Sequence, residues 1–118
     1  MKLPSLIAVA AMMVTAVACS SAKPPVPQAA GPVVEVTIAN GTVTPTNATL
    51  TAKVGQPITL RVNSDADDEL HVHSTPEHEF EVSPKPEQEF TFAVDVPGSV
   101  AVELHHLDRT VATIQVQP

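Results

Sequence analysis

Residues 33–64 read VVEVTIANGTVTPTNATLTAKVGQPITLRVNS. Apolar side chains recur at every second position in three parts of this stretch, residues 34–38, 48–52 and 58–62. A period of two places alternate side chains on opposite faces of a β-strand, whereas a helix needs a period near 3.6. The dipeptide Asn40-Gly41 follows the first of these parts and favours the two-residue turn of a β-hairpin. The stretch therefore predicts short strands that each bury one face.

The rest of the chain continues this pattern, and Pro97-Gly98 adds a further turn signal. Apolar residues alternate with polar or small ones at residues 70–72, 80–82, 90–94, 100–104 and 112–116. No segment after residue 33 has helical periodicity. We predict an all-β fold of seven or eight strands, arranged as a two-sheet sandwich or a Greek-key barrel.

Length and charge narrow the class of protein. The chain has 118 residues, which allows one domain, and we expect a monomer. Six basic residues against thirteen acidic ones give a net charge of −7, which would repel a phosphate backbone and excludes a nucleic-acid partner. A single Cys excludes a disulfide framework, a zinc ribbon and a thiolate redox pair. No Gly-x-Ser-x-Gly nucleophile motif is present, and we expect no enzymatic activity.

Residues 1–18 have the composition of a secretory signal peptide. Lys2 precedes an uncharged segment, residues 3–18, that is short for a transmembrane helix of about 20 apolar residues. The sequence Ala16-Val17-Ala18-Cys19 resembles the lipobox of bacterial lipoproteins, which implies that Cys19 carries lipid (palmitate among its acyl groups) and becomes the first mature residue. The alternative is a cleaved signal with an Ala-x-Ala site and an incidental thiol at Cys19.

Residues 19–32 contain four prolines and predict an extended linker after the lipidated Cys. The lipoprotein resemblance implies that the domain formed by residues 33–118 is held at the extracytoplasmic face of the cell membrane. We expect the lipid on Cys19 to make the membrane contact, and the sequence identifies no protein partner.

Residues 33–118 resemble bacterial cupredoxin-like domains. The features that match are Pro45 after the first strand, the turn Val54-Gly55-Gln56, the segment from Asp68 to His73, and the turn at Pro97-Gly98. The resemblance implies a Greek-key β-sandwich, and it places His71 at the position of the first copper ligand. It also implies that the two segments richest in histidine meet at one end of the sandwich.

The chain departs from that family in the residues that would hold blue copper. A blue-copper site uses two His, one Cys thiolate and a weak axial ligand that is usually Met. Cys19 is the only Cys, and all three Met lie within residues 1–18. We therefore do not expect blue-copper electron transfer.

All five histidines fall in two clusters, residues 71–78 and residues 105–106. Two positions apart on a predicted strand, His71 and His73 share one face. His106 has the parity of the core-facing residues 100–104, whereas His105 has the parity of the solvent-facing ones. The metal ligands that we predict are His71 and His73 together with His105 or His106, and the carboxylate candidates are Glu69, Glu103 and Asp108. His78 is the weakest of the histidine candidates, since it stands between two glutamates.

Imidazole and carboxylate donors favour Cu(II) and also accept Zn(II). Nine of the thirteen acidic residues lie between Asp65 and Glu89, where they would concentrate cations around the first histidine cluster. The sequence thus indicates a module that buffers, carries or senses Cu(II) or another divalent metal at the cell envelope. The alternative is a β-sandwich that binds no metal and serves as a structural or interaction domain, with the His and acidic residues forming a solvated face.

Overall fold

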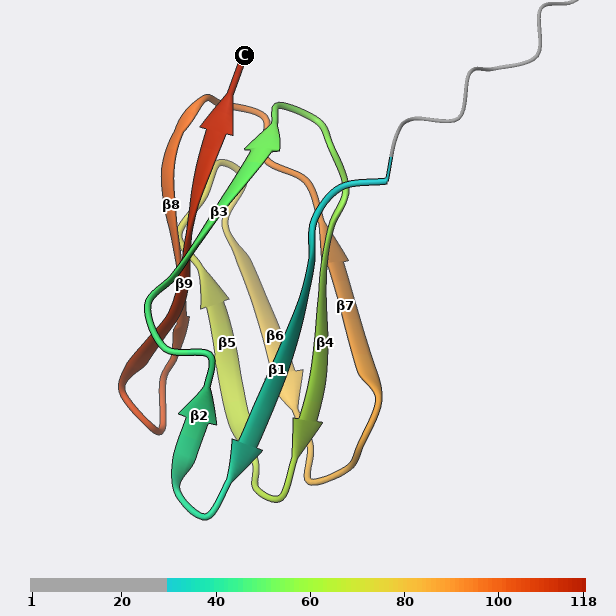
Figure 1. The fold of residues 1–118 in the computed structure, drawn as a ribbon, viewed down its shortest axis with the longest axis vertical. Helices are drawn as coiled ribbons and strands as arrows, with labels where there is room; N and C mark the ends of the chain where they lie inside the picture. The colour runs from blue at the N-terminus through green and yellow to red at the C-terminus, as the bar shows by residue number, and fades with distance from the viewer. Residues whose placement is uncertain (1–29) are drawn as a thin grey trace, which may run out of the picture.

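The computed structural model describes residues 30–118 (Figure 1). The predicted signal peptide, the predicted lipidation site at Cys19 and most of the predicted linker lie outside these residues. The nine strands are β1 (Val33–Ala39), β2 (Thr42–Thr44), β3 (Ala48–Lys53), β4 (Ile58–Ser64), β5 (Asp68–Val72), β6 (His78–Val82), β7 (Gln88–Phe92), β8 (Gly98–Leu104) and β9 (Arg109–Gln117). Residues 30–118 contain no helix, and thus none long and apolar enough to cross a membrane.

The strands form two sheets that lie face to face in Figure 1. The four-stranded sheet has the order β2-β1-β4-β7, and the five-stranded sheet has the order β3-β9-β8-β5-β6. The pairs β1–β4 and β3–β9 are parallel, and the other pairs are antiparallel. This arrangement confirms the all-β, two-sheet prediction.

The core lies between the sheets and consists of the alternate apolar side chains. Val36 and Leu60 come from the four-stranded sheet, and Leu70, Val102 and Ile114 come from the five-stranded sheet; all five are fully buried. The residues between them point outward, because successive side chains on a strand face opposite sides. Burial of the inward set therefore fixes which residues each sheet presents on its outer face.

The structure has one strand more than the predicted upper limit of eight. The additional strand is β2, whose three residues bury only Val43. It ends before Pro45, which has no N–H to donate to a ladder, and the chain then crosses to the other sheet to begin β3. A strand that buries a single side chain leaves too short an alternation to be recognised in the sequence.

The predicted hairpin turn at Asn40-Gly41 is confirmed. Ala39 pairs with Thr42, and both turn residues have positive φ values, 52° for Asn40 and 72° for Gly41. A two-residue turn with φ positive at both positions suits the right-handed twist of the flanking strands. The Asn40 N–H also donates to the carboxylate of Asp65 over 2.9 Å.

A buried carboxylate holds the turn between β8 and β9 against β5. Asp68 is 3% exposed, and its oxygens accept hydrogen bonds from the backbone N–H groups of His106 (2.9 Å) and Leu107 (3.2 Å). The Glu69 N–H donates to the same carboxylate over 2.7 Å. Asp68 therefore connects the first residue of β5 to a turn that follows almost 40 positions later in the chain.

We expect Asp68→Ala to lower the free energy of unfolding by about 2–4 kcal/mol, because it leaves two N–H groups of the β8–β9 turn without their acceptor. Urea denaturation followed by far-ultraviolet circular dichroism measures this loss.

The matched control is Asp67→Ala, which removes an exposed carboxylate one position away and should change the stability by no more than about 0.5 kcal/mol. Equal losses in the two variants would contradict a specific role for the Asp68 carboxylate.

Candidate metal centre

The histidine cluster lies on the outer face of the five-stranded sheet. Leu70 and Val72 of β5 are buried, so Glu69 and His71 face away from the core. His71 stands opposite Glu79 of β6 and opposite Glu103 of β8 in the sheet register. His73 has the same parity and stays attached to the sheet, because its N–H donates to the Ala101 carbonyl over 2.9 Å.

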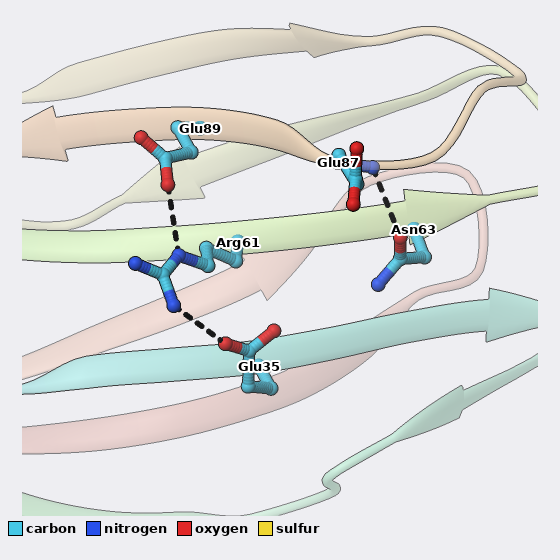
Figure 2. Close-up of a pocket in the computed structure, with 5 residues that line it drawn as sticks. All are labelled: Glu35, Arg61, Asn63, Glu87 and Glu89. Carbon is cyan, nitrogen blue, oxygen red and sulfur yellow. Dashed lines mark hydrogen bonds and ion pairs between the residues drawn. The ribbon is translucent and has the colours of Figure 1, made fainter.

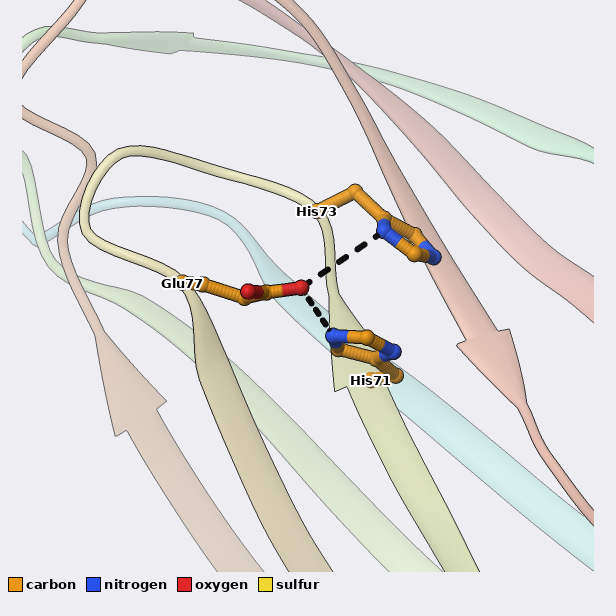
Figure 3. A group of neighbouring side chains, drawn as sticks. All are labelled: His71, His73 and Glu77. Carbon is orange, nitrogen blue, oxygen red and sulfur yellow. Dashed lines mark hydrogen bonds and ion pairs between the residues drawn. The ribbon is translucent and has the colours of Figure 1, made fainter.

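Three side chains converge at the end of β5, as Figure 3 shows. The Nε2 atom of His71 contacts Oε1 of Glu77, and Nδ1 of His73 lies 3.8 Å from the same oxygen. One ligand atom from each of these residues can be chosen so that all three lie within 4.8 Å of one another. The imidazole ring centroids of His71 and His73 are 4.1 Å apart. Two imidazole nitrogens and one carboxylate thus point toward a common position.

A fourth group stands beside them on the neighbouring strand. Oε1 of Glu79 lies 3.7 Å from Nε2 of His71. The His71 side chain is 13% exposed, whereas those of His73, Glu77 and Glu79 are 44%, 57% and 60% exposed. The position on which these groups converge is therefore open to solvent on one side and backed by the sheet on the other.

Further residues surround the two imidazole rings. Nε2 of His105 lies 2.9 Å from Nδ1 of His71, and Nδ1 of His105 lies 2.8 Å from Oε1 of Glu69. On the other ring, Nε2 of His73 lies 2.9 Å from Oε2 of Glu103. The predicted carboxylate candidates Glu69 and Glu103 therefore contact the outer nitrogens of the cluster rather than the nitrogens that face Glu77.

His105 reaches this cluster because its backbone continues the pairing of β8 with β5. Its N–H donates to the Glu69 carbonyl over 3.0 Å, so its side chain keeps the outward parity that the sequence predicts. The core-facing parity predicted for His106 is wrong. His106 is exposed, and its Nδ1 lies 3.1 Å from the Asp67 carbonyl oxygen. Strand β8 ends at Leu104, and the turn that follows rotates the next side chains out of the strand alternation.

The two His segments come together, since His71 contacts both His73 and His105. They meet on the outer face of the five-stranded sheet, beside the end of β5 (Figure 3). Two other predicted candidates, His78 and Asp108, have different surroundings. His78 is half-buried, and its ring centroid is 5.5 Å from that of Phe92 and 6.0 Å from that of Phe80. Asp108 is an exposed turn residue with a φ of 51°.

Glu77 and Glu79 are the two site residues that the sequence analysis did not propose as ligands. Glu77 follows His73 by four positions, and this short spacing was the available signal. Glu79 approaches His71 only through the pairing of β5 with β6. No Lys or Arg of residues 30–118 forms an ion pair with the glutamates of the cluster, so the group keeps a negative electrostatic potential that attracts cations.

A surface depression of about 520 Å³ lies on the outer face of the other sheet (Figure 2). The positively charged side chain that lines this depression is Arg61, which forms ion pairs with Glu89 over 2.8 Å and with Glu35 over 3.2 Å. The guanidinium of Arg61 donates hydrogen bonds to both carboxylates, and these bonds, first to Glu89 and then to Glu35, raise the pKa of Arg61. Because both partners neutralise it within the protein, this arginine is not a free anion-binding group.

The donor set on the sheet face does not fit blue copper. That centre needs a thiolate, and residues 30–118 contain neither Cys nor Met. The donors that are present, imidazole nitrogen and carboxylate oxygen, suit Cu(II) and Zn(II) without a thiolate.

Comparisons with known proteins bear on the fold. No family model matches the chain, and no curated protein matches it in sequence. Among solved structures, the reduced auracyanin of the photosynthetic bacterium Roseiflexus castenholzii is 13% identical, with a TM-score of 0.51 over 75% of this chain and 99% of that one. A chain of a heme-copper terminal oxidase dimer is 17% identical, with a TM-score of 0.51 over 70% of this chain and 63% of that one. A Cu(I) form of an amicyanin variant is 19% identical, with a TM-score of 0.48 over 72% and 82% of the two chains.

The similarity to auracyanin and the two stacked sheets confirm the predicted cupredoxin-like β-sandwich. At these sequence identities the similarity shows a shared fold only. Which ligands this chain can bind has to be inferred from its own side chains.

Proposed function

We propose that this protein binds one divalent transition-metal ion on the outer face of the five-stranded sheet, through His71, His73 and Glu77. The observation that carries the proposal is the convergence of two imidazole nitrogens on one carboxylate oxygen. Donors bonded to one ion at about 2.0–2.1 Å lie at most about 4 Å apart. The three ligand atoms lie within 4.8 Å of one another, so His73 would move inward by less than about 1 Å. His71 and Glu77 are in contact and would separate to admit the ion, which the exposed Glu77 side chain allows.

The donor types favour Cu(II) as the ion, with Zn(II) as the second choice. Divalent copper binds nitrogen and oxygen donors more tightly than the other first-row divalent ions. Glu79 stands 3.7 Å from His71 Nε2 and supplies a fourth donor on the same side. The solvent-open side of the site leaves room for the ion to enter and leave, which suits buffering, carriage or sensing of the metal rather than electron transfer.

We also propose that the protein is a lipoprotein of the cell envelope. The support is the lipobox-like sequence that ends at Cys19 and the proline-rich residues up to 32, which would hold the domain away from the membrane surface. A lipid on Cys19 would place the metal site in the extracytoplasmic space, where free and exchangeable metal ions are met first.

Calorimetric titration with Cu(II) and with Zn(II) tests the metal site, and electron paramagnetic resonance reports the donors around Cu(II). We expect one ion per chain, with nitrogen and oxygen donors. His71→Ala and His73→Ala should each weaken binding about 100-fold or more, equivalent to roughly 2.8 kcal/mol, because each removes one of the three donors.

The control is His106→Ala, which removes an exposed imidazole that lies outside the converging group and should leave the affinity unchanged. If the unmodified protein binds neither ion more tightly than about micromolar, or if all three variants bind alike, the metal proposal is wrong and the alternative of a scaffold without metal stands.

Membrane attachment is tested separately with Cys19→Ser in a bacterial host. We expect the unmodified chain to enter the detergent phase of a Triton X-114 separation and to incorporate labelled palmitate. The Cys19→Ser variant should do neither, because the sulfur that carries the lipid is missing. Ser20→Ala is the control and should behave as the unmodified chain; equal behaviour of Cys19→Ser and the unmodified chain would contradict a lipid anchor at this position.

A further inference from the structure

We propose that Asn40 is a modification site, at which the side-chain amide is converted to a carboxyl group without an enzyme, and that Asp65 sets the rate of this conversion. The co-reactant is water, and the products are aspartate and isoaspartate at position 40. The inference goes beyond the proposed function, because it concerns the β1–β2 turn and depends on neither a metal ion nor a lipid.

The reaction takes place between a side chain and the backbone of the next residue. The backbone nitrogen of Gly41 attacks Cγ of Asn40, and the new N–C bond closes a succinimide ring. The side-chain nitrogen leaves as ammonia and takes the proton of the Gly41 N–H with it. Water then opens the ring. Cleavage of the bond to Cγ gives aspartate, and cleavage of the bond to the main-chain carbonyl carbon gives isoaspartate.

Gly41 leaves the path of this attack open. A side chain on the residue after an asparagine hinders the approach of the backbone nitrogen, and glycine has none. Gly41 is exposed, and outside its two neighbours in the chain no atom lies within 4 Å of the position that a Cβ would occupy. Its N–H has no hydrogen-bond partner within residues 30–118, so the nitrogen is free to react.

Asn40 supplies an equally accessible amide. The residue is exposed, and in the part of the chain that the structure describes its side chain forms no hydrogen bond. Its φ of 52° is one that asparagine tolerates better than most residues, which is why asparagine suits this turn. The residue that forms the hairpin therefore also provides the reactive group.

The hairpin that carries the turn is only weakly held. Strand β2 has three residues, of which only Val43 is buried, and β1 is its only neighbour in the sheet. A short edge strand with one buried side chain is among the first elements of a fold to open locally. Each opening releases the turn and lets the backbone of Asn40 rotate into the conformation that ring closure needs.

The carboxylate of Asp65 opposes this opening. It accepts the Asn40 N–H over 2.9 Å, and the Asp65 N–H donates to the Ile38 carbonyl over 3.1 Å. The two bonds tie the turn to the segment that follows β4. The negative charge of Asp65 also disfavours loss of the proton from the Gly41 nitrogen, because that loss creates a second negative charge nearby. Asp65 therefore slows the reaction in two ways.

The other two asparagines of the chain lack this combination of features. Asn47 is exposed, but Ala48 follows it and places a Cβ beside the attacking nitrogen. Asn63 is half-buried in β4, and its Oδ1 accepts the Glu87 N–H over 2.9 Å. Both residues therefore serve as controls within the same molecule.

The products of the reaction weaken the hairpin. Aspartate at position 40 brings a second carboxylate close to that of Asp65, and like charges repel each other. Isoaspartate adds a carbon to the main chain inside a two-residue turn and so disturbs the pairing of Ala39 with Thr42. Conversion of Asn40 would thus release β2, while the other strands keep their own partners.

Peptide mapping by mass spectrometry tests the site on the full chain, kept folded in detergent micelles at mildly alkaline pH. We expect the mass increase that replacement of the amide nitrogen by oxygen produces to occur at Asn40 before it occurs at Asn47 or Asn63. Enzymatic methylation of isoaspartate should label the same peptide. An unchanged Asn40, or equal conversion of all three asparagines, would overturn the inference.

Asp65→Ala tests the control of the rate, with Asp67→Ala as the matched loss of an exposed carboxylate two positions away. We expect Asp65→Ala to speed the conversion about 2- to 10-fold, the factor that corresponds to the loss of one hydrogen bond. Asp67→Ala should convert at the rate of the unmodified chain. Equal rates in the two variants would show that Asp65 has no specific role.

Asn40→Asp reproduces one product and tests its effect on the hairpin. The control is Asn40→Gly, which tolerates the positive φ and adds no charge. Hydrogen exchange followed by NMR should be faster for the β2 amides in Asn40→Asp than in Asn40→Gly, with no difference in β4 or β5. Equal exchange in β2 would contradict its release. Because none of these measurements involves a metal, they keep their meaning if the metal proposal fails.

Discussion

The hydrogen bonds accepted by the buried Asp68 carboxylate are the interaction on which the geometry of the candidate metal centre depends. The carboxylate accepts the N–H groups of His106 and Leu107, and it thereby holds the β8–β9 turn beside the first residues of β5. This contact brings His105 within 2.9 Å of His71, although the two are 34 positions apart in the chain. The carboxylate buried at the start of β5 and the hydrogen bond from the His105 N–H to the Glu69 carbonyl together hold His105 beside His71.

The core and the site use opposite faces of the same strand. Leu70 and Val72 are completely buried, and this burial fixes the register that turns Glu69 and His71 toward solvent. The sheet then supplies carboxylates from both neighbours, Glu79 from β6 and Glu103 from β8. A polar cluster on an outer face avoids the desolvation cost that ionised groups would incur between the sheets, and it remains accessible to an exchangeable ion.

A cupredoxin-like sandwich can thus present imidazole and carboxylate donors without the thiolate of blue copper. The absence of Cys and Met from residues 30–118 removes that chemistry, and the rigid β-sheet still provides closely spaced positions for other ligands. The sheet differs from a loop in that its register sets the neighbours of each side chain. Metal chemistry therefore follows from which residues occupy the outward positions, and fold similarity alone does not determine it.

The sequence by itself determined the all-β class, the turn at Asn40-Gly41 and the pairing of His71 with His73 on one face, because alternation and turn chemistry are local properties. It also determined that residues 30–118 contain no thiolate, whereas lipidation at Cys19 stays a prediction. Only the tertiary structure decided that His105 and not His106 joins the cluster, since the end of β8 at Leu104 is set by pairing across the sheet. The partners of His71 likewise depended on strand register, because Glu79 and Glu103 approach it through hydrogen bonds between strands that no local pattern encodes.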